Sequence, residues 1–249
     1  MKKLPEITLA FWVMKIAATT LGETAGDMFS MTLHLGYAIS SLALISIFLI
    51  TLLSQLFSKK YHPFLYWAVI LSTSTAGTTM SDFMDRTLGL GYATGSLILF
   101  SLLLVVFLFW RLTAGSMSVN LIKSKKVELL YWIAILFSNT LGTALGDFLA
   151  DSSGLGFLGG ALLIGCLLAG IICMNYFTPL SKVGLFWAAF VLTRPFGATV
   201  GDLLSKVPAK GGLGFGTVGS SAVLALILIV LILVQIRQES RLSSLTLET

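Results

Sequence analysis

The side chains best suited to chemistry in this sequence are carboxylates that lie inside apolar segments. An aspartate follows a tryptophan by fifteen residues in four separate stretches of the chain. The tryptophans are Trp12, Trp67, Trp132 and Trp187, and the aspartates are Asp27, Asp82, Asp147 and Asp202. Carboxylates in such surroundings bind cations, carry protons or pair with buried bases. Their regular spacing indicates an internal repeat, which sets the frame for the rest of the chain.

The repeat extends beyond these two positions. Each tryptophan follows an aromatic residue, a glycine lies ten residues after it, and glycine or serine precedes each aspartate. A Gly-aromatic pair then opens a second apolar run in every copy: Gly36-Tyr37, Gly91-Tyr92, Gly156-Phe157 and Gly214-Phe215. Each copy therefore contains two apolar segments. We expect the repeats to occupy 8–57, 64–110, 129–176 and 183–236, with a linker at 111–128.

The composition indicates that lipid surrounds much of the chain. Hydrophobic residues make up 56% of the sequence and charged residues 11%, whereas soluble domains are about 25% charged. Each apolar segment has about 20 residues, enough to cross a ~30 Å hydrocarbon core as a helix. The segments lack the period-two polarity of barrel strands. The sequence therefore predicts an all-α, polytopic membrane protein with eight transmembrane helices in a single membrane domain, 1–249.

The basic residues outside the apolar segments are distributed unequally between the two sides. Eleven fall on the side of both termini and the 111–128 linker, and three, Arg86, Lys206 and Lys210, fall on the other. The positive-inside rule then places both termini in the cytoplasm, in a bacterial inner membrane. All four repeats share one orientation, which predicts a pseudo-fourfold or pseudo-twofold arrangement about the membrane normal. We expect the lipid bilayer, and not nucleic acid, as a partner; an oligomer is left open.

With these features the sequence resembles a bacterial family of uncharacterised integral membrane proteins built from four tandem two-helix repeats with a recurrent tryptophan. The resemblance extends from about Phe11 to Ser220. It implies the same helical fold and the same membrane location. Because this family has no assigned substrate, the resemblance implies no activity, and the candidate site rests on the residues themselves.

One face of each first helix carries a polar stripe. Positions seven, eleven and fifteen after the tryptophan lie four residues apart, so their side chains stack on one face. In unit order they are Thr19, Glu23 and Asp27; Ser74, Thr78 and Asp82; Asn139, Thr143 and Asp147; and Arg194, Ala198 and Asp202. Position eight adds Thr20, Thr75 and Thr140. Because polarity facing lipid is costly, we expect the four stripes to line a central polar cavity.

Three ionisable residues break the repeat and are therefore the strongest functional candidates. Glu23 replaces a threonine or alanine of the other units, and Arg194 replaces a small polar residue. We expect these two to face each other inside the membrane. Lys15 lies nearer the cytoplasmic side, where we expect its ammonium group to reach the interface. The external mouth holds Asp85, Arg86 and Asp151, which we expect to be solvated.

The four repeated aspartates have two interpretations. Each lies just before a short external connection, so it could cap the second helix of its unit or satisfy backbone groups in the connection. Alternatively, the four carboxylates form an ion-binding ring. The small residues beside them, such as Gly22 and Gly26, are typical of close helix packing in membranes.

The oxygen-rich stripe favours hard cations over soft ones. We expect a transporter of a small hard cation, such as divalent Mn²⁺, with proton coupling because clustered carboxylates disfavour one another's ionisation. The expected binding residues are Glu23, Asp27, Asp82, Asp147, Asp202, Arg194, Thr20, Thr75, Asn139, Thr140 and Thr143, and the expected metal ligands are Glu23, Asp27 and Asp147. The alternatives are an anion or small-solute transporter that uses Arg194, and a membrane partner or sensor without transport. We expect no enzyme, since no catalytic triad, phosphate loop or zinc signature occurs, and no cofactor beyond the transported ion.

Overall fold

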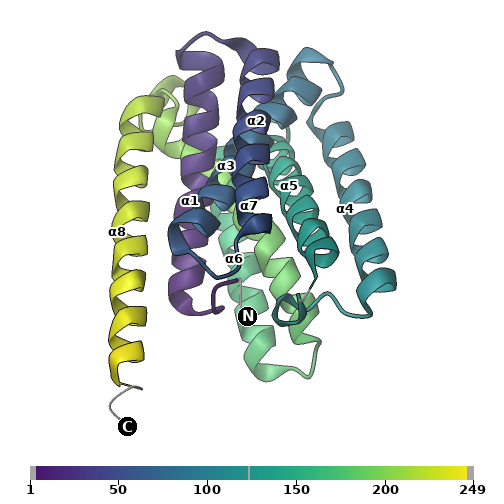
Figure 1. The fold of residues 1–249 in the computed structure, drawn as a ribbon. Helices are drawn as coiled ribbons and strands as arrows, with labels where there is room; N and C mark the ends of the chain where they lie inside the picture. The colour runs from purple at the N-terminus through teal and green to yellow at the C-terminus, as the bar shows by residue number, and fades with distance from the viewer. Residues whose placement is uncertain (1–3, 123, 246–249) are drawn as a thin grey trace.

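A computed structural model describes residues 4–122 and 124–245 (Figure 1). Within these ranges the chain forms eight long helices and no strand. They are α1 (Leu9–Asp27), α2 (Gly36–Phe57), α3 (Pro63–Asp82), α4 (Tyr92–Ala114), α5 (Lys125–Asp147), α6 (Gly156–Phe177), α7 (Lys182–Ser205) and α8 (Gly216–Leu245). Two of these helices correspond to each of the four predicted repeats. Helix α1 begins and α8 ends at the same end of the bundle (Figure 1).

Six of these helices are long and apolar enough to cross a membrane: α2, α4, α5, α6, α7 and α8. The two remaining helices, α1 and α3, carry the polar stripes of the first two units. The even helices expose large apolar side chains, for example Leu42 and Ile50 on α2. Lipid is the solvent that favours such surfaces, so the structure agrees with a multi-pass membrane protein.

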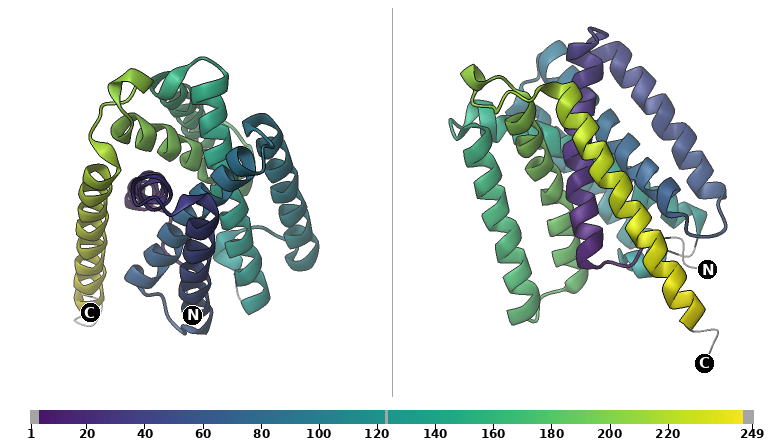
Figure 2. Two further views of the ribbon diagram at one scale, coloured as in Figure 1. Left: turned by 90° about the horizontal axis from the view of Figure 1, so that it is seen from above. Right: turned by 90° about the vertical axis from the view of Figure 1, so that its left-hand side faces the viewer.

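The odd-numbered helices form a closed ring. Helix α1 packs against α3, α3 against α5, α5 against α7, and α7 against α1. Each even helix packs chiefly on the first helix of the next unit: α2 on α3, α4 on α5, α6 on α7 and α8 on α1. Figure 2 shows α8 lying across α1 at the edge of the bundle. The last unit thereby closes onto the first.

Glycines allow the close approach of neighbouring helices in this ring. A Cβ atom on Gly22 would lie 2.1 Å from the Ser74 hydroxyl oxygen, and one on Gly77 would lie 3.0 Å from the Asn139 carbonyl carbon. Gly142 and Gly197 face Arg194 and Thr19 in the same way. The glycine at position ten of each unit therefore contacts position seven of the next unit, which confirms the packing role that the sequence predicts.

Aromatic side chains close one end of the ring. The residue before each tryptophan contacts the tryptophan of the next unit, with ring centroids 5.6 to 6.0 Å apart. These pairs are Phe11–Trp67, Tyr66–Trp132, Tyr131–Trp187 and Phe186–Trp12. The hydroxyl groups of Tyr66 and Tyr131 lie 2.8 Å apart, so the two polar tips satisfy each other. The repeated tryptophans thus belong to a packed layer at the start of the odd helices.

The connection between the second and third units is shorter than the predicted 111–128 linker. Helix α4 continues to Ala114 and α5 begins at Lys125, with a helical turn at Val119–Leu121 between them. Gly115 ends α4 with φ of 70°, a left-handed conformation that glycine adopts without steric cost. Basic residues near this connection therefore belong partly to the helix ends.

The glycine contacts lead to a stability prediction. We expect Gly77→Ala to lower the free energy of unfolding by about 1–3 kcal/mol, because its methyl group would meet the backbone of α5. Thermal unfolding in detergent measures the change. The matched control is Gly170→Ala on α6, where no atom lies within 4 Å of the new methyl group. There the higher helix propensity of alanine should stabilise by up to ~1 kcal/mol. Equal effects of the two substitutions would contradict the close packing.

Candidate functional site

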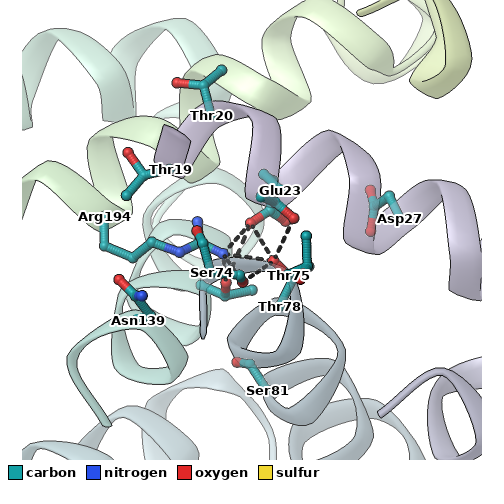
Figure 3. Close-up of polar contacts among 12 residues, drawn as sticks. Thr19, Thr20, Glu23, Asp27, Ser74, Thr75, Thr78, Ser81, Asn139 and Arg194 are labelled. Carbon is teal, nitrogen blue, oxygen red and sulfur yellow. Dashed lines mark hydrogen bonds and ion pairs between the residues drawn. The ribbon is translucent and has the colours of Figure 1, made fainter. Parts of the chain in front are cut away.

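Arg194 on α7 lies where the four odd helices meet. Its side chain is fully buried, with an exposed fraction of 0%. The Nη2 atom lies 2.9 Å from Glu23 Oε2 on α1 and 2.6 Å from Thr78 Oγ1 on α3 (Figure 3). It also lies 2.7 Å from Thr143 Oγ1 on α5. One nitrogen atom therefore contacts all three other helices of the ring. The structure brings Glu23 and Arg194 together, as their positions in the sequence predict.

Glu23 accepts more than this one bond. The Thr78 and Thr143 hydroxyl groups lie 3.3 Å and 3.2 Å from the same carboxylate oxygen. A buried ion pair repays its desolvation only when further hydrogen bonds satisfy both partners. The two threonines, at position eleven of their units, supply such bonds to Glu23 and to Arg194 Nη2. Unit four has Ala198 at this position, packed against Gly146.

Two of the repeated aspartates share one base. Asp82 and Asp147 are 2–3% exposed. Each lies four residues, about one helical turn, after the position in its own unit that corresponds to Glu23 in unit one. Arg86 Nε lies 2.8 Å from Asp82 Oδ1, and Arg86 Nη2 lies 2.9 Å from Asp147 Oδ2. Arg86 therefore links the second unit to the third. The expectation that Arg86 is merely solvated is wrong, because its guanidinium turns inward to these carboxylates.

The other two repeated aspartates share a lysine in the same way. Lys206 lies 3.3 Å from Asp202 Oδ1 and forms an ion pair with Asp27. It therefore links the fourth unit to the first. Both bases follow the aspartate of their own unit by four residues, so each binds its own aspartate and that of the next unit. In units two and four a basic residue stands nineteen residues after the tryptophan and four after the aspartate. This spacing is the sequence signal from which the ion pairs could have been predicted.

The capping interpretation of the aspartates is wrong for the first three units. After Asp27, Asp82 and Asp147 the helix continues into a five-residue π-helical turn: Met28–Thr32, Phe83–Thr87 and Phe148–Ser152. The residues that precede α2, α4 and α6 are Leu35, Gly91 and Leu155, and none makes a side-chain cap hydrogen bond. The extra turn separates these three aspartates from the following helix, and their side chains are buried in the bundle.

Lys15 also lies elsewhere than expected. Its exposed fraction is 0%, and its ammonium group lies 3.4 Å from Asn139 Oδ1 and 4.2 Å above the Phe190 ring. The prediction that it reaches the membrane interface is wrong. Lys15 is four residues before Thr19 on the same helical face, so its side chain enters the ring with the polar stripe. Asp85, expected in solvent, is buried as well and accepts a hydrogen bond from Ser81; Asp151 is exposed.

Four of the predicted site residues lie in the ring but do not contact Glu23. Thr20, Thr75 and Thr140 are buried, and each hydroxyl donates to the carbonyl four residues earlier in its own helix. Asn139 accepts from Lys15 and donates to Thr73 at 2.9 Å. Position eight is therefore used for local hydrogen bonding, which the sequence pattern alone does not distinguish from binding.

Three carboxylates converge. Oxygen atoms of Glu23, Asp147 and Asp202 lie within 4.8 Å of one another, and all three residues are buried. They belong to α1, α5 and α7. The sequence predicted Glu23, Asp27 and Asp147 as the metal ligands. The structure brings Asp202 into this cluster, with Asp27 outside it, because four equivalent aspartates cannot be ranked before the helices are placed.

The centre of the ring is packed at the level of Arg194, where the sequence predicts a cavity. Arg194, Thr78 and Thr143 each have an exposed fraction of 0%. Gly142 lies directly against the Arg194 side chain. In this structure the polar stripes therefore bind one another across the ring, and the aromatic layer closes one end of it.

The buried pair leads to a second prediction. We expect Arg194→Gln to destabilise the protein by about 3–5 kcal/mol, because Glu23 would remain buried without its counter-charge. The double variant Glu23→Gln/Arg194→Gln should recover part of that loss, which a double-mutant cycle of thermal unfolding measures. Arg111→Gln, at the exposed end of α4, is the matched control and should be near neutral. Strictly additive single effects would show that the two charges do not interact.

Comparison with known proteins agrees with this arrangement. The family described as Repeat of Unknown Function (DUF347) matches the chain four times, at residues 10–61, 65–116, 130–180 and 185–241. No match is found among curated proteins or among solved structures. Each matched range holds one odd helix and the even helix that follows it. These matches cover most of the sequence and confirm the resemblance inferred from the repeated motif. The chain belongs to the DUF347 repeat family.

Proposed function

We propose that this protein transports a small hard cation, such as Mn²⁺, across the bacterial inner membrane. The observation that carries the proposal is the cluster of Glu23, Asp147 and Asp202, whose oxygens from three helices lie within 4.8 Å of one another. An ion equidistant from three oxygens at the upper limit of that separation would be roughly 2.8 Å from each, so a small inward movement of the side chains would bring them to the ~2.3–2.6 Å that hard cations such as Ca²⁺ prefer. Carboxylates gathered inside a membrane bundle are costly unless an ion or a proton neutralises them.

The ion pairs around the cluster leave two negative charges unbalanced. Five carboxylates occupy this region: Glu23, Asp27, Asp82, Asp147 and Asp202. Among the described residues, the bases that form ion pairs with them are Arg86, Arg194 and Lys206. When all are ionised, two negative charges have no base. A bound divalent cation would supply the missing charge, and two protons would do the same.

Arg194 would act as a tethered counter-charge in this cycle. Its Nη2 atom donates a hydrogen bond to Glu23 Oε2, so both carboxylate oxygens of Glu23 can bind a cation only when Arg194 moves away. Arg86 and Lys206 lie between the aspartates and the end of the ring opposite the aromatic layer, with side chains 29% and 16% exposed. Movement of these bases would open that end. Release of the cation at the other end would require the aromatic side chains to move apart. Protons that bind the emptied carboxylates would then let the transporter return to its starting conformation.

We also propose how the eight helices cross the membrane and which symmetry relates the four units. All eight helices would cross the membrane, α1 and α3 included, because they complete the ring and have 19 and 20 residues. At ~1.5 Å per residue these lengths approach the thickness of the hydrocarbon core. The cyclic contacts of the four units fit pseudo-fourfold symmetry about the membrane normal, which the bases of units two and four reduce to pseudo-twofold.

A cation is favoured over an anion as the cargo. An anion carried through the ring as cargo would have to pass Glu23 and the other carboxylates, which would repel it. A membrane partner or sensor without transport is distinguished by the assay below. The partner or sensor alternative predicts that the purified protein gives no flux of any small ion while still binding a partner.

The transport prediction uses purified protein in proteoliposomes with an internal dye quenched by Mn²⁺. We expect Glu23→Gln, Asp147→Asn and Asp202→Asn each to reduce the rate at least tenfold, about 1.4 kcal/mol in the transport barrier, because each removes a ligand oxygen charge. Asp151→Asn is the matched control, since this exposed carboxylate lies outside the cluster. Wild-type rates in all three cluster variants would refute the proposed cation site.

The topology prediction uses single cysteines in a variant that lacks Cys166 and Cys173. A membrane-impermeant maleimide applied to intact cells should label His34→Cys and Leu88→Cys, which lie at the external connections. Lys59→Cys should react only after permeabilisation, because it lies at the predicted cytoplasmic end. Labelling of Lys59→Cys from outside would reverse the proposed orientation, and equal labelling of all three would exclude the crossing of α2 and α3.

A further inference from the structure

Hydrogen-bond donors without acceptors gather at the centre of the ring, between the aromatic layer and Glu23. Arg194 is fully buried, yet its Nε and Nη1 atoms have no hydrogen-bond partner among residues 4–122 and 124–245. Ser74 is also fully buried, and its hydroxyl has no partner. The two residues are in contact, since Arg194 Nη2 lies 3.4 Å from the Ser74 carbonyl oxygen. Buried donors of this kind are expensive to leave unsatisfied.

Lys15 brings a second positive charge into the same region. It extends from α1 to Asn139 on α5, across the ring, while Arg194 extends from α7 to Ser74 on α3. The two basic side chains therefore cross the ring along different diagonals at neighbouring levels. Within the described residues, no carboxylate lies within ion-pair distance of Lys15. Its partners are the Asn139 amide oxygen and the face of the Phe190 ring.

The surrounding side chains do not supply the missing acceptor. The Thr19 hydroxyl donates to backbone carbonyls of its own helix and of Thr193. Ile70 and Ile135, which stand at the position of Lys15 in units two and three, are apolar and fully buried. The Lys15 ammonium group is thus buried without a carboxylate, and Arg194, which is paired with Glu23 through Nη2, keeps two donors unsatisfied. A buried charge without a partner normally requires a counter-ion.

We propose that a small inorganic anion, with the chemistry of chloride, binds on the axis of the ring between Lys15 and Arg194. The Lys15 ammonium, the free Arg194 nitrogens and the Ser74 hydroxyl donate to it. This anion differs from the proposed cargo: it lies on the aromatic side of Arg194, whereas the carboxylate cluster lies on the other side. The bound anion holds Lys15 and Arg194 in place while the Glu23 carboxylate releases Arg194 and binds a cation.

The test compares thermal unfolding of the full-length protein in detergent, in sodium chloride and in sodium gluconate at equal ionic strength. Chloride should raise the midpoint by about 5 °C at a hundredfold excess over its dissociation constant. Lys15→Met should abolish this gain. Its midpoint in gluconate should equal or exceed that of the wild type, because the variant removes a buried charge without a carboxylate partner.

Ser74→Ala gives a milder variant that keeps part of the packing against Gly22, because the Cβ atom of residue 74 remains while the hydroxyl group is lost. We expect it to weaken chloride binding, so that a higher chloride concentration is needed for half of the shift. The matched control is Ser40→Ala on α2, another fully buried serine without a hydrogen-bond partner, which should keep the full chloride shift.

Equal midpoints of the wild type in chloride and gluconate would overturn the proposal and would indicate that water satisfies these donors. A full chloride shift in Lys15→Met, or an unchanged concentration dependence in Ser74→Ala, would overturn it as well. None of these three results would count against cation transport, because the proteoliposome assay depends on the carboxylate cluster. Loss of Mn²⁺ flux with an intact chloride shift would conversely refute the cation site alone.

Discussion

The buried contact between Arg194 and Glu23 is the interaction on which the interior of the bundle depends. Neither group has access to water, so each needs a partner supplied by the ring itself. The threonines at position eleven of units two and three supply the additional hydrogen bonds. Because one guanidinium nitrogen joins all three neighbouring helices, the four odd helices can hold this arrangement only at one register. The glycine contacts fix that register from the backbone side.

The four units provide a scaffold by repetition and a candidate site by deviation from it. The glycines, the aromatic layer and the aspartates recur, and each acts between one unit and the next. Arg86 and Lys206 occur in alternate units, and Glu23 and Arg194 occur once each. Function in a repeat protein of this kind is expected where the repeated pattern changes, because identical units can only build a symmetric frame. The proposed cation cluster combines both sources: one unique carboxylate and two repeated ones.

Charge is arranged in layers along the ring. Lys15 and Arg194 lie on the aromatic side, the five carboxylates follow, and Arg86 and Lys206 lie beyond them. Alternating layers reduce the cost of burying so many ionisable groups, since each layer is the counter-charge of its neighbours. The same alternation would give an ion that enters the ring a strongly position-dependent affinity, which suits a site that must both bind and release.

The sequence alone determined the repeat, the all-helical class and the approximate bounds of the four two-helix units, because period and polarity are local properties of the chain. It also predicted that Glu23 and Arg194 face each other, because polar side chains inside a membrane avoid lipid. It also identified the aspartates, although it could not separate Asp202 from Asp27 as the third member of the cluster. Only the tertiary structure decided that Arg86, Lys206 and Lys15 turn into the bundle and that Thr20, Thr75 and Thr140 bond their own helices. These outcomes depend on which helix stands next to which, and each unit here completes its contacts with the following unit rather than within itself.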